Sequence, residues 1–179
     1  MKNIFFYETN IGTIGIVEEN QQITNVLFEA DSCFSKNAGL NTALSEQIDS
    51  NRNMIFNGYQ LNESHLIKEA SNQLYEYLQG ERQRFSLPLA PSGTTFMKKV
   101  WECLCNIPYG KTKSYKEIAL AAGNERACRA VGLANNRNPI PLFIPCHRVI
   151  GSNGKLIGYR GGLQTKQALL ALEKQYADI

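Results

Sequence analysis

Three short runs rich in Ile, Val and Phe follow one another in the first 29 residues, at residues 3–9, 12–18 and 22–29. Turn-forming residues separate them: Asn10 precedes the second run and Gly12 begins it, and Asn20 stands between the second and the third. Strand-favouring runs joined by such turns predict an antiparallel meander. The first part of the chain is therefore expected to be built around a small sheet.

The spacing of apolar residues becomes helical after Asn62. Apolar side chains recur at residues 67, 70, 74, 77 and 78, and Gly80 stands where a C-terminal helix cap is expected. The intervening residues 31–60 are polar and predict a long loop, with room for a short helix or an edge strand. Residues 85–91, which hold two prolines, predict an extended linker. We therefore expect an α+β supporting domain at residues 1–90 and a mostly helical domain at residues 91–179.

Capping signals mark the helices of the second domain. Thr94 is a candidate N-cap, and Ser114 with Glu117 forms a capping-box pattern at the start of a helix that ends near Gly123. Asn124 is the expected cap of the next helix. Two short helices joined by a tight turn with a Gly form a helix-turn-helix pattern, although many unrelated helix pairs show the same pattern.

The last third of the chain combines an apolar run with turn residues. Residues 142–144 are apolar and lead into Pro145-Cys146-His147. Asn153-Gly154 is typical of a hairpin turn. A final helix is expected to begin near Gln164 and to bury Leu169, Leu172 and Tyr176.

Charge is distributed unevenly along the chain. The net charge of +3 hides a net −5 over residues 1–93 and a net +8 over residues 94–179. A basic half next to an acidic half favours a polyanionic partner for the basic half. A solvated basic surface explains the same charges, so charge alone does not decide between the two.

Composition restricts the class of protein further. Apolar residues make up 43% and charged residues 20% of the chain, as in globular proteins. A membrane-spanning helix needs about 18 apolar residues in a row, and neither such a run nor a signal-peptide pattern is present. We therefore expect a cytoplasmic protein without a membrane partner. The five cysteines are scattered and the two histidines lack a zinc-like spacing, so no disulfide framework, metal or cofactor is expected.

Cys146 is the strongest candidate for a chemical role. A cysteine becomes a nucleophile when a base or a positive charge lowers its pKa, and His147 and Arg148 supply both kinds of group next to it. Most cysteines are instead small buried apolar residues, and His147 is equally compatible with a structural role. The local pattern leaves both interpretations open.

Several motifs in register resemble one protein family. Ile144-Pro145-Cys146-His147-Arg148-Val149 is similar to the active-site signature of the O6-alkylguanine-DNA alkyltransferases. Further pieces follow the family's order and approximate spacing: Ser114-Tyr115, Arg129-Ala130-Val131-Gly132, Asn138-Pro139, Gly158-Tyr159, Gly161-Gly162 and Leu172-Glu173. The resemblance is strong over residues 94–173 and loose over residues 1–93. It implies a ribonuclease H-like first domain and a winged-helix-like second domain.

The resemblance also implies catalytic roles. Cys146 would accept the alkyl group, and His147 would take the thiol proton through a water molecule. Glu173 would hold the tautomer of His147, as the third member of a triad does. Asn138 would fix the active-site turn, and Tyr115 would donate a hydrogen bond to guanine N3.

The resemblance places the remaining site residues on the DNA and around the base. The guanine has to rotate out of the stack, because this is its only route to a buried thiol. Arg129 would fill the gap that the base leaves. The other DNA-binding residues are Arg126, Ala127, Ala130 and Gly132, on a helix that enters the minor groove. Val149, Tyr159 and Arg160 would join Tyr115 in lining the substrate pocket. Some members of the family have a small residue where this chain has Arg160, which puts the width of the pocket in doubt.

The implied function is direct-reversal DNA repair by a single-turnover methyltransferase. A monomer would bind double-stranded DNA that contains O6-alkylguanine, with O4-alkylthymine as a further substrate, and would transfer the alkyl group irreversibly. Three alternatives remain at this stage: a non-catalytic module that binds alkylated DNA, a helix-turn-helix transcription regulator, and a cysteine hydrolase. Such non-catalytic relatives replace the acceptor cysteine, whereas Cys146 is present here.

Overall fold

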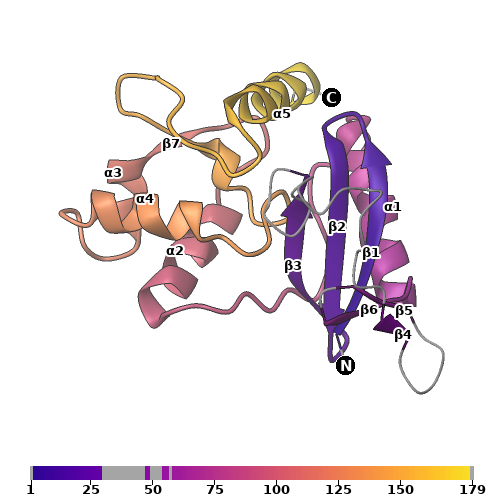
Figure 1. Ribbon diagram of the computed structural model, residues 1–179. Coiled ribbons are helices and arrows are strands. Elements are labelled where there is room, and N and C mark those ends of the chain that lie inside the picture. Colours follow the sequence, from indigo (N-terminus) through magenta and orange to yellow (C-terminus); the bar gives the residue numbers. More distant parts are fainter. Residues whose placement is uncertain (1, 30–46, 49–53, 57, 178–179) are drawn as a thin grey trace.

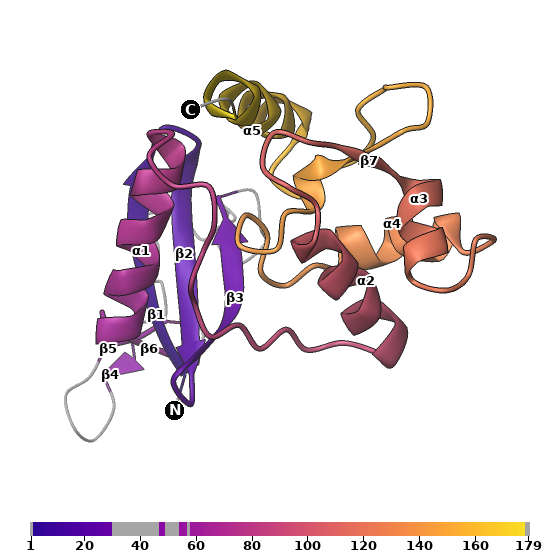
Figure 2. The ribbon, with the colours of Figure 1, turned by 180° about the vertical axis from the view of Figure 1, so that it is seen from behind.

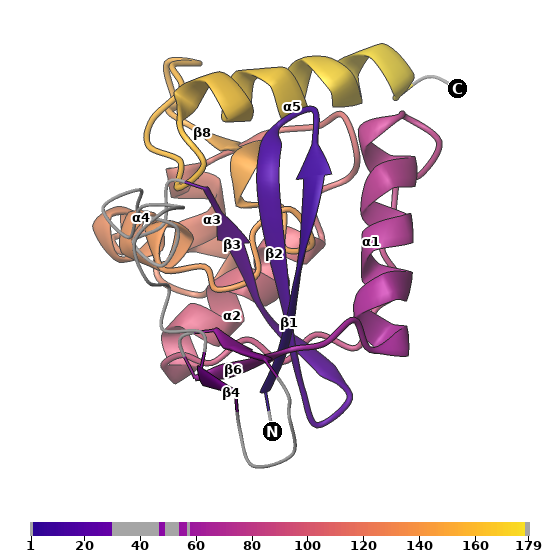
Figure 3. The same ribbon diagram turned by 45° about the vertical axis from the view of Figure 1, so that its right-hand side comes forward.

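The computed structural model describes residues 2–29, 47–48, 54–56 and 58–177. A sheet with a helix packed on it forms the first half of the chain, and a group of helices lies beside it (Figure 1). The last helix crosses over the end of the first two strands and reaches the end of the helix packed on the sheet (Figure 3). The fold is therefore α+β, as the sequence predicts.

The predicted meander is confirmed, with strand ends within one or two residues of the expected ones. It consists of β1 (Lys2–Thr9), β2 (Gly12–Glu19) and β3 (Gln22–Phe28), which pair in antiparallel fashion. Asn20 and Gln21 connect β2 to β3 with φ angles of 53° and 60°. Two consecutive positive φ angles are the requirement of a tight hairpin turn, and Asn tolerates them well.

Three very short strands extend the sheet. They are β4 (Gln47–Ile48), β5 (Met54–Phe56) and β6 (Tyr59–Leu61), and the strand order is β3-β2-β1-β6-β5-β4. The pairing of β6 with β1 is parallel, whereas the other pairings in this sheet are antiparallel. The expected loop at 31–60 thus contains short strands in its described part, and residues 30–46 lie outside the described residues.

One face of the sheet is covered by α1 (His65–Leu78) (Figure 2). The Ser64 hydroxyl accepts a hydrogen bond from the Ile67 amide and caps the N-terminus of α1, and Gly80 follows its C-terminus with a φ of 82°. The five apolar positions predicted from the spacing are all buried: Ile67, Ala70, Leu74, Tyr77 and Leu78. An apolar stripe of this kind packs a helix onto a sheet.

The expected linker is bound to the edge of the sheet. The Ile23 amide donates to the Pro88 carbonyl at 2.8 Å, and the Ala90 amide donates to the Ile23 carbonyl at 2.9 Å. On the same edge strand, the Val26 amide donates to the carbonyl of Pro139, from the second half, at 2.8 Å. These bonds satisfy backbone groups of the exposed edge. The main apolar core runs without a break from β2 through α1 into the second half, and the division at residue 90 stays a prediction.

The second half contains four α-helices, namely α2 (Thr95–Cys105), α3 (Tyr115–Ala121), α4 (Cys128–Asn136) and α5 (Leu163–Tyr176). Strands β7 (Lys113–Ser114) and β8 (Val149–Ile150) pair in parallel. The Thr94 cap of α2 and the Ser114–Glu117 capping box of α3 are confirmed. Helices α3 and α4 form the predicted helix-turn-helix.

Three local predictions were wrong. Asn124 does not cap α4, because its Oδ1 accepts from the Arg126 amide at 3.2 Å and α4 begins only after Ala127. Asn153-Gly154 forms a turn but no hairpin, because β8 pairs with β7 instead of a following strand. Along α5, Leu169 is buried as predicted, whereas Leu172 and Tyr176 are only partly buried. Lys166 and Glu173 are fully buried on this helix instead.

Candidate active site

Cys146 lies at the start of a single 3-10 turn, Cys146–Arg148, after the apolar run of residues 142–144. Asn138 fixes the approach to this turn. Its Nδ2 donates to the Ile144 carbonyl at 2.9 Å, and its Oδ1 accepts from the Ile140 amide at 3.0 Å. Because Asn138 is 1% exposed, both bonds are shielded from water. The positioning role that the family resemblance implies for Asn138 stays a prediction.

Burial controls the protonation of the Cys146 thiol. The side chain is 5% exposed, and burial raises the pKa of the thiol above its usual range. A hydrogen bond from Asn138 and the positive charges of Lys166 and Arg160 act in the opposite direction on this pKa. The thiol therefore retains its proton near neutral pH, and a nucleophilic Cys146 requires a base.

His147 is the titratable side chain next to Cys146. Its Nε2 lies 2.8 Å from Oε1 of Glu173, and the ring is fully buried. An ionised carboxylate only accepts hydrogen bonds, so Nε2 carries the proton and Nδ1 is the free acceptor. Nδ1 is buried without a hydrogen-bond partner among the described residues. Burial lowers the pKa of His147, although Glu173 acts to raise it. Because the net change is a lower pKa, the ring is neutral and able to accept a proton.

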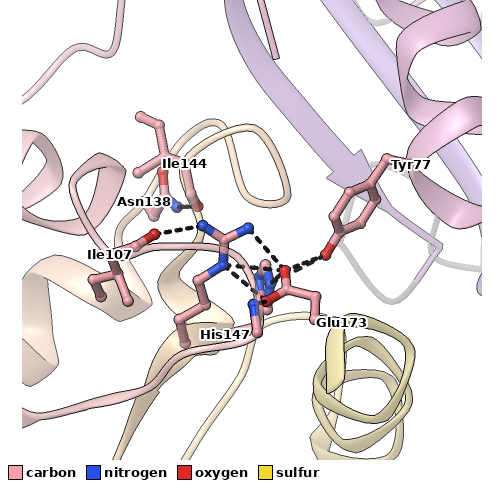
Figure 4. A network of polar contacts seen from close by, with 8 residues as sticks. Tyr77, Ile107, Asn138, Ile144, His147 and Glu173 are labelled. Atoms are coloured by element: carbon pink, nitrogen blue, oxygen red, sulfur yellow. Dashed lines mark hydrogen bonds and ion pairs between the residues drawn. The ribbon is translucent and has the colours of Figure 1, made fainter. Parts of the chain in front are cut away.

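Glu173 is the centre of a polar network that joins the two halves of the chain (Figure 4). Arg148 binds it in a bidentate manner, with Nε 2.9 Å from Oε2 and Nη2 2.9 Å from Oε1. The Tyr77 hydroxyl donates to Oε1 at 2.7 Å, and the Gly110 amide donates to Oε2 at 3.1 Å. Burial alone would raise the pKa of this carboxyl, but its partners His147 and Arg148 outweigh burial and hold the pKa at about 2.

A cavity of about 340 Å³ opens beside Cys146. It is lined by residues of the helix-turn-helix and of the loop before α5, namely Tyr115, Cys128, Arg129, Gly132, Asn135, Asn136, Cys146, Ile157, Gly158 and Tyr159. The Tyr159 hydroxyl is buried without a hydrogen-bond partner among the described residues. Buried polar groups without partners are costly, and Tyr159 is one of the residues that line the cavity.

The structure brings some of the predicted residues into the cavity and leaves others outside. Tyr115, Arg129, Gly132 and Tyr159 line it together with Cys146, and the Tyr115 hydroxyl donates to the Ile157 carbonyl at 3.0 Å. The remaining predicted DNA-binding and substrate-pocket residues do not line it. They are Arg126 and Ala130, which are exposed, Ala127, which is partly buried, Val149, which is buried, and Arg160, whose Nη1 lies 3.5 Å from the Asn138 carbonyl.

Sequence reasoning missed Tyr77, Lys166 and Asn135. The Lys166 ammonium is buried and donates to the carbonyls of Val149 at 2.7 Å, Ile157 at 3.0 Å and Gly158 at 3.4 Å. It therefore ties the cavity wall to the strand that follows Cys146. Tyr77 and Lys166 lie at helical core positions, where periodicity predicts packing and gives no signal for a polar role.

The described residues offer little support for other kinds of site. Among them, no group of three His, Cys, Asp or Glu side chains is placed to hold a metal ion. No helix in the described part of the chain is long and apolar enough to cross a membrane. The fold and the site define a class of protein in which a buried Cys-His-Glu centre lies next to a helix-turn-helix.

Comparison with known proteins identifies the family. The family model of the 6-O-methylguanine DNA methyltransferase ribonuclease-like domain matches residues 5–91. The family model of the 6-O-methylguanine DNA methyltransferase DNA binding domain matches residues 95–175. The constitutive methylated-DNA–protein-cysteine methyltransferase of Bacillus subtilis is 43% identical over 169 residues, which are 93% of this chain and 92% of the relative. A methyltransferase of the same name from Methanosarcina barkeri is 60% identical over 108 residues, covering 60% of this chain and 68% of the relative.

A solved structure agrees with these matches. The crystal structure of Mycobacterium tuberculosis OGT in complex with DNA matches with a TM-score of 0.79 at 35% identity, covering 97% of this chain and 94% of that one. The chain belongs to the 6-O-methylguanine DNA methyltransferase family.

Proposed function

We propose that this protein repairs DNA as a methylated-DNA–protein-cysteine methyltransferase, with Cys146 as the acceptor of the alkyl group. The observation that carries the proposal is the arrangement around Cys146. A buried thiol lines a cavity, and the residue after it is a neutral, buried histidine with a free Nδ1. Such a pair produces a nucleophile only when a proton can move from sulfur to nitrogen.

The reaction is a displacement at the alkyl carbon. The thiol proton passes to His147 through a water molecule, and the sulfur forms a bond to carbon while the bond between carbon and guanine O6 breaks. The electron pair of that bond stays on the guanine ring, where a hydrogen bond from Tyr115 to N3 stabilises it. The guanine then takes up a proton, so that the sum is thiol plus alkylguanine giving thioether plus guanine. Glu173 holds His147 in the tautomer that this step needs.

We infer that the base leaves the DNA stack. Cys146 lines its cavity and is 5% exposed, which supports this inference because a guanine inside a duplex cannot bring its O6 to a buried sulfur. Arg129, which is exposed on α4 and also lines the cavity, would fill the gap in the stack. The small side chains of Ala127, Ala130 and Gly132 allow this helix to approach the minor groove closely, and Arg126 supplies a phosphate contact.

The pocket residues supply hydrogen bonds to the extruded base. The Val149 carbonyl accepts from Lys166, and we expect its second lone pair to accept from the guanine amine. We expect the buried Tyr159 hydroxyl, which has no hydrogen-bond partner among the described residues, to provide a further polar contact to the base. We expect Arg160, whose Nη1 lies 3.5 Å from the Asn138 carbonyl, to affect the width of the pocket and the size of the alkyl group that it accepts.

The product is a thioether, which has no easy reverse reaction, so one protein molecule repairs one lesion. We propose that the protein acts as a monomer on double-stranded DNA in the cytoplasm, with O6-alkylguanine as substrate and O4-alkylthymine as a second one. The lesion-binding module and the transcription regulator are the competing functions, and both differ from this proposal in stoichiometry.

The test is the intact mass of the full chain after incubation with a duplex that contains O6-methylguanine. We expect a gain of one methyl group per protein, mapped by peptide mass to Cys146 and not to Cys128, which lines the same cavity. Cys146→Ala is expected to gain no mass, whereas Cys105→Ser, at an exposed cysteine outside the cavity, is expected to behave as the wild type. Tight binding without a mass gain would identify a binding module, and more than one methyl group per protein would contradict a single acceptor.

A further inference from the structure

Helix α1 brings one polar atom of the first half into the Cys-His-Glu centre. The Tyr77 hydroxyl donates to Glu173 Oε1 at 2.7 Å and lies 3.2 Å from His147 Nε2 (Figure 4). The side chain is fully buried, and its ring packs on Phe85 and Tyr109 at centroid distances of 5.1 and 6.0 Å. The ring therefore belongs to the core, while the hydroxyl contacts two groups of the site.

The hydroxyl is one of several donors around a buried carboxylate. Glu173 receives hydrogen bonds from four residues, Arg148, Gly110, His147 and Tyr77, and the oxygen that Tyr77 contacts, Oε1, also accepts from His147 and Arg148. With these donors in place, rotation of the carboxylate breaks at least one buried bond, which is costly. The orientation of Glu173 in turn fixes the orientation of the His147 ring.

We propose that Tyr77 is a positioning residue for the alkyl transfer, because its hydroxyl locks Glu173, and through it His147, in the arrangement that leaves Nδ1 free to accept the proton of Cys146. This inference rests on the proposed function. It gives the first half of the chain a direct part in the chemistry, in addition to its part in the shared core.

The charges around His147 determine what the loss of the hydroxyl does. The groups that act on the ring are Glu173 and Lys166 from α5, Tyr77 from α1, Arg148 from its own turn, and Tyr159 from the loop before α5. Without the Tyr77 hydroxyl, Glu173 loses one donor and holds the Nε2 proton more strongly, which raises the pKa of His147. The neutral ring, which is the form that accepts a proton, then requires a higher pH.

The experiment compares full-length Tyr77→Phe with Tyr109→Phe. Tyr109 is a matched control, because its ring lies in the same cluster and its hydroxyl is buried without a hydrogen-bond partner among the described residues. Two rates are measured between pH 5 and 9: modification of Cys146 by iodoacetamide, followed by peptide mass, and single-turnover methyl transfer from an O6-methylguanine duplex. For Tyr77→Phe we expect both rates to fall roughly tenfold at pH 7. This loss is smaller than the rate enhancement of about 10²–10⁴ that a general base contributes, because the base is misplaced and not removed. The acid limb of both profiles should move upward by about 0.5 pH unit, the size expected for one hydrogen bond.

Each outcome decides the proposal. A Tyr77→Phe protein with the wild-type pH profile, or with rates reduced only by the unfolded fraction seen in urea titration, would show that the hydroxyl serves packing alone. The double variant with Glu173→Gln gives a second test that does not depend on the size of the single effect. If Tyr77 acts through Glu173, its effect on the iodoacetamide rate vanishes in that background, whereas additive effects overturn the proposal.

The iodoacetamide reaction separates this inference from the proposed function, because it needs no DNA. A shifted Cys146 profile in Tyr77→Phe, in a protein that takes no methyl group from the duplex, would overturn the proposed function and support the coupling of Tyr77 to Cys146. Methyl transfer with an unshifted profile would support the proposed function and overturn the role of Tyr77.

Discussion

Glu173→Gln should destabilise the protein strongly, because it leaves the buried positive charge of Arg148 without its carboxylate partner. Glu173 is fully buried and Arg148 is 6% exposed. Leaving one member of such a pair without its partner costs roughly 3–5 kcal/mol. The pKa of Glu173 gives an independent value: a decrease from 4.5 to about 2 corresponds to about 3 kcal/mol at about 1.36 kcal/mol per unit. For a chain of this length, the melting temperature should fall by roughly 6–20 °C.

The pH dependence provides a second signature of the same charge. A carboxyl whose pKa is lower in the folded than in the unfolded state stabilises the fold above its unfolded pKa, near 4.5. That stabilisation is lost as the pH falls towards the folded pKa of about 2. The wild type should therefore lose about 3 kcal/mol from this group between pH 4.5 and 2, and Glu173→Gln should lose none of it.

Urea unfolding followed by tryptophan fluorescence measures both effects. Trp101 is the single tryptophan of the chain, is 1% exposed, and donates to the Ala134 carbonyl at 2.9 Å. Glu117→Gln is the control, because the pKa of Glu117 is also lowered to about 2 by hydrogen bonds with Lys113 and Ser114, although this carboxyl is exposed to solvent. We expect a much smaller loss there. A loss below about 1 kcal/mol for Glu173→Gln at pH 7 would refute the reasoning.

Three further predictions follow from contacts around the cavity and the core. Lys166→Met, which leaves three carbonyls without their buried donor, should cost about 1–3 kcal/mol in urea unfolding and slow methyl transfer, and an unchanged transfer rate would contradict its role in the cavity wall. In the same assay, Asn138→Ala should lower the free energy of unfolding by about 2–3 kcal/mol, because two buried hydrogen bonds disappear. An unchanged free energy of unfolding would show that the turn is stable without the Asn138 side chain. Gly93→Ala should lower the melting temperature, because its Cβ would lie 2.5 Å from the Trp101 ring, whereas Gly132→Ala, with 3.9 Å to Tyr115, should melt as the wild type does.

The local elements were predictable because local bonds make them. The meander of β1–β3, the Thr94 cap and the Ser114–Glu117 capping box each depend on residues a few positions apart. The same is true of the apolar face of α1, whose period is visible in the sequence. Family motifs then placed Cys146 and its neighbours, and they did so without any knowledge of the contacts that these residues make.

The wrong predictions are those in which one residue had two local options. Asn124 can cap a helix or close a turn, and the structure has the turn. Asn153-Gly154 is typical of a hairpin, but Lys113-Ser114, far away in the sequence, takes the place of the expected partner strand. On α5, the buried face holds Lys166 and Glu173, because polar partners from other elements satisfy them.

The sequence by itself determined the class of fold, the position of the helix-turn-helix and the identity of the candidate nucleophile. Only the tertiary structure decided which groups surround that nucleophile. Glu173 meets Arg148 across 25 positions, and Tyr77 meets His147 and Glu173 across 70 and 96 positions. No periodicity or cap encodes contacts of that range. They exist because burial of the apolar faces of α1 and α5 in one core forces the polar atoms on those helices to find partners in each other.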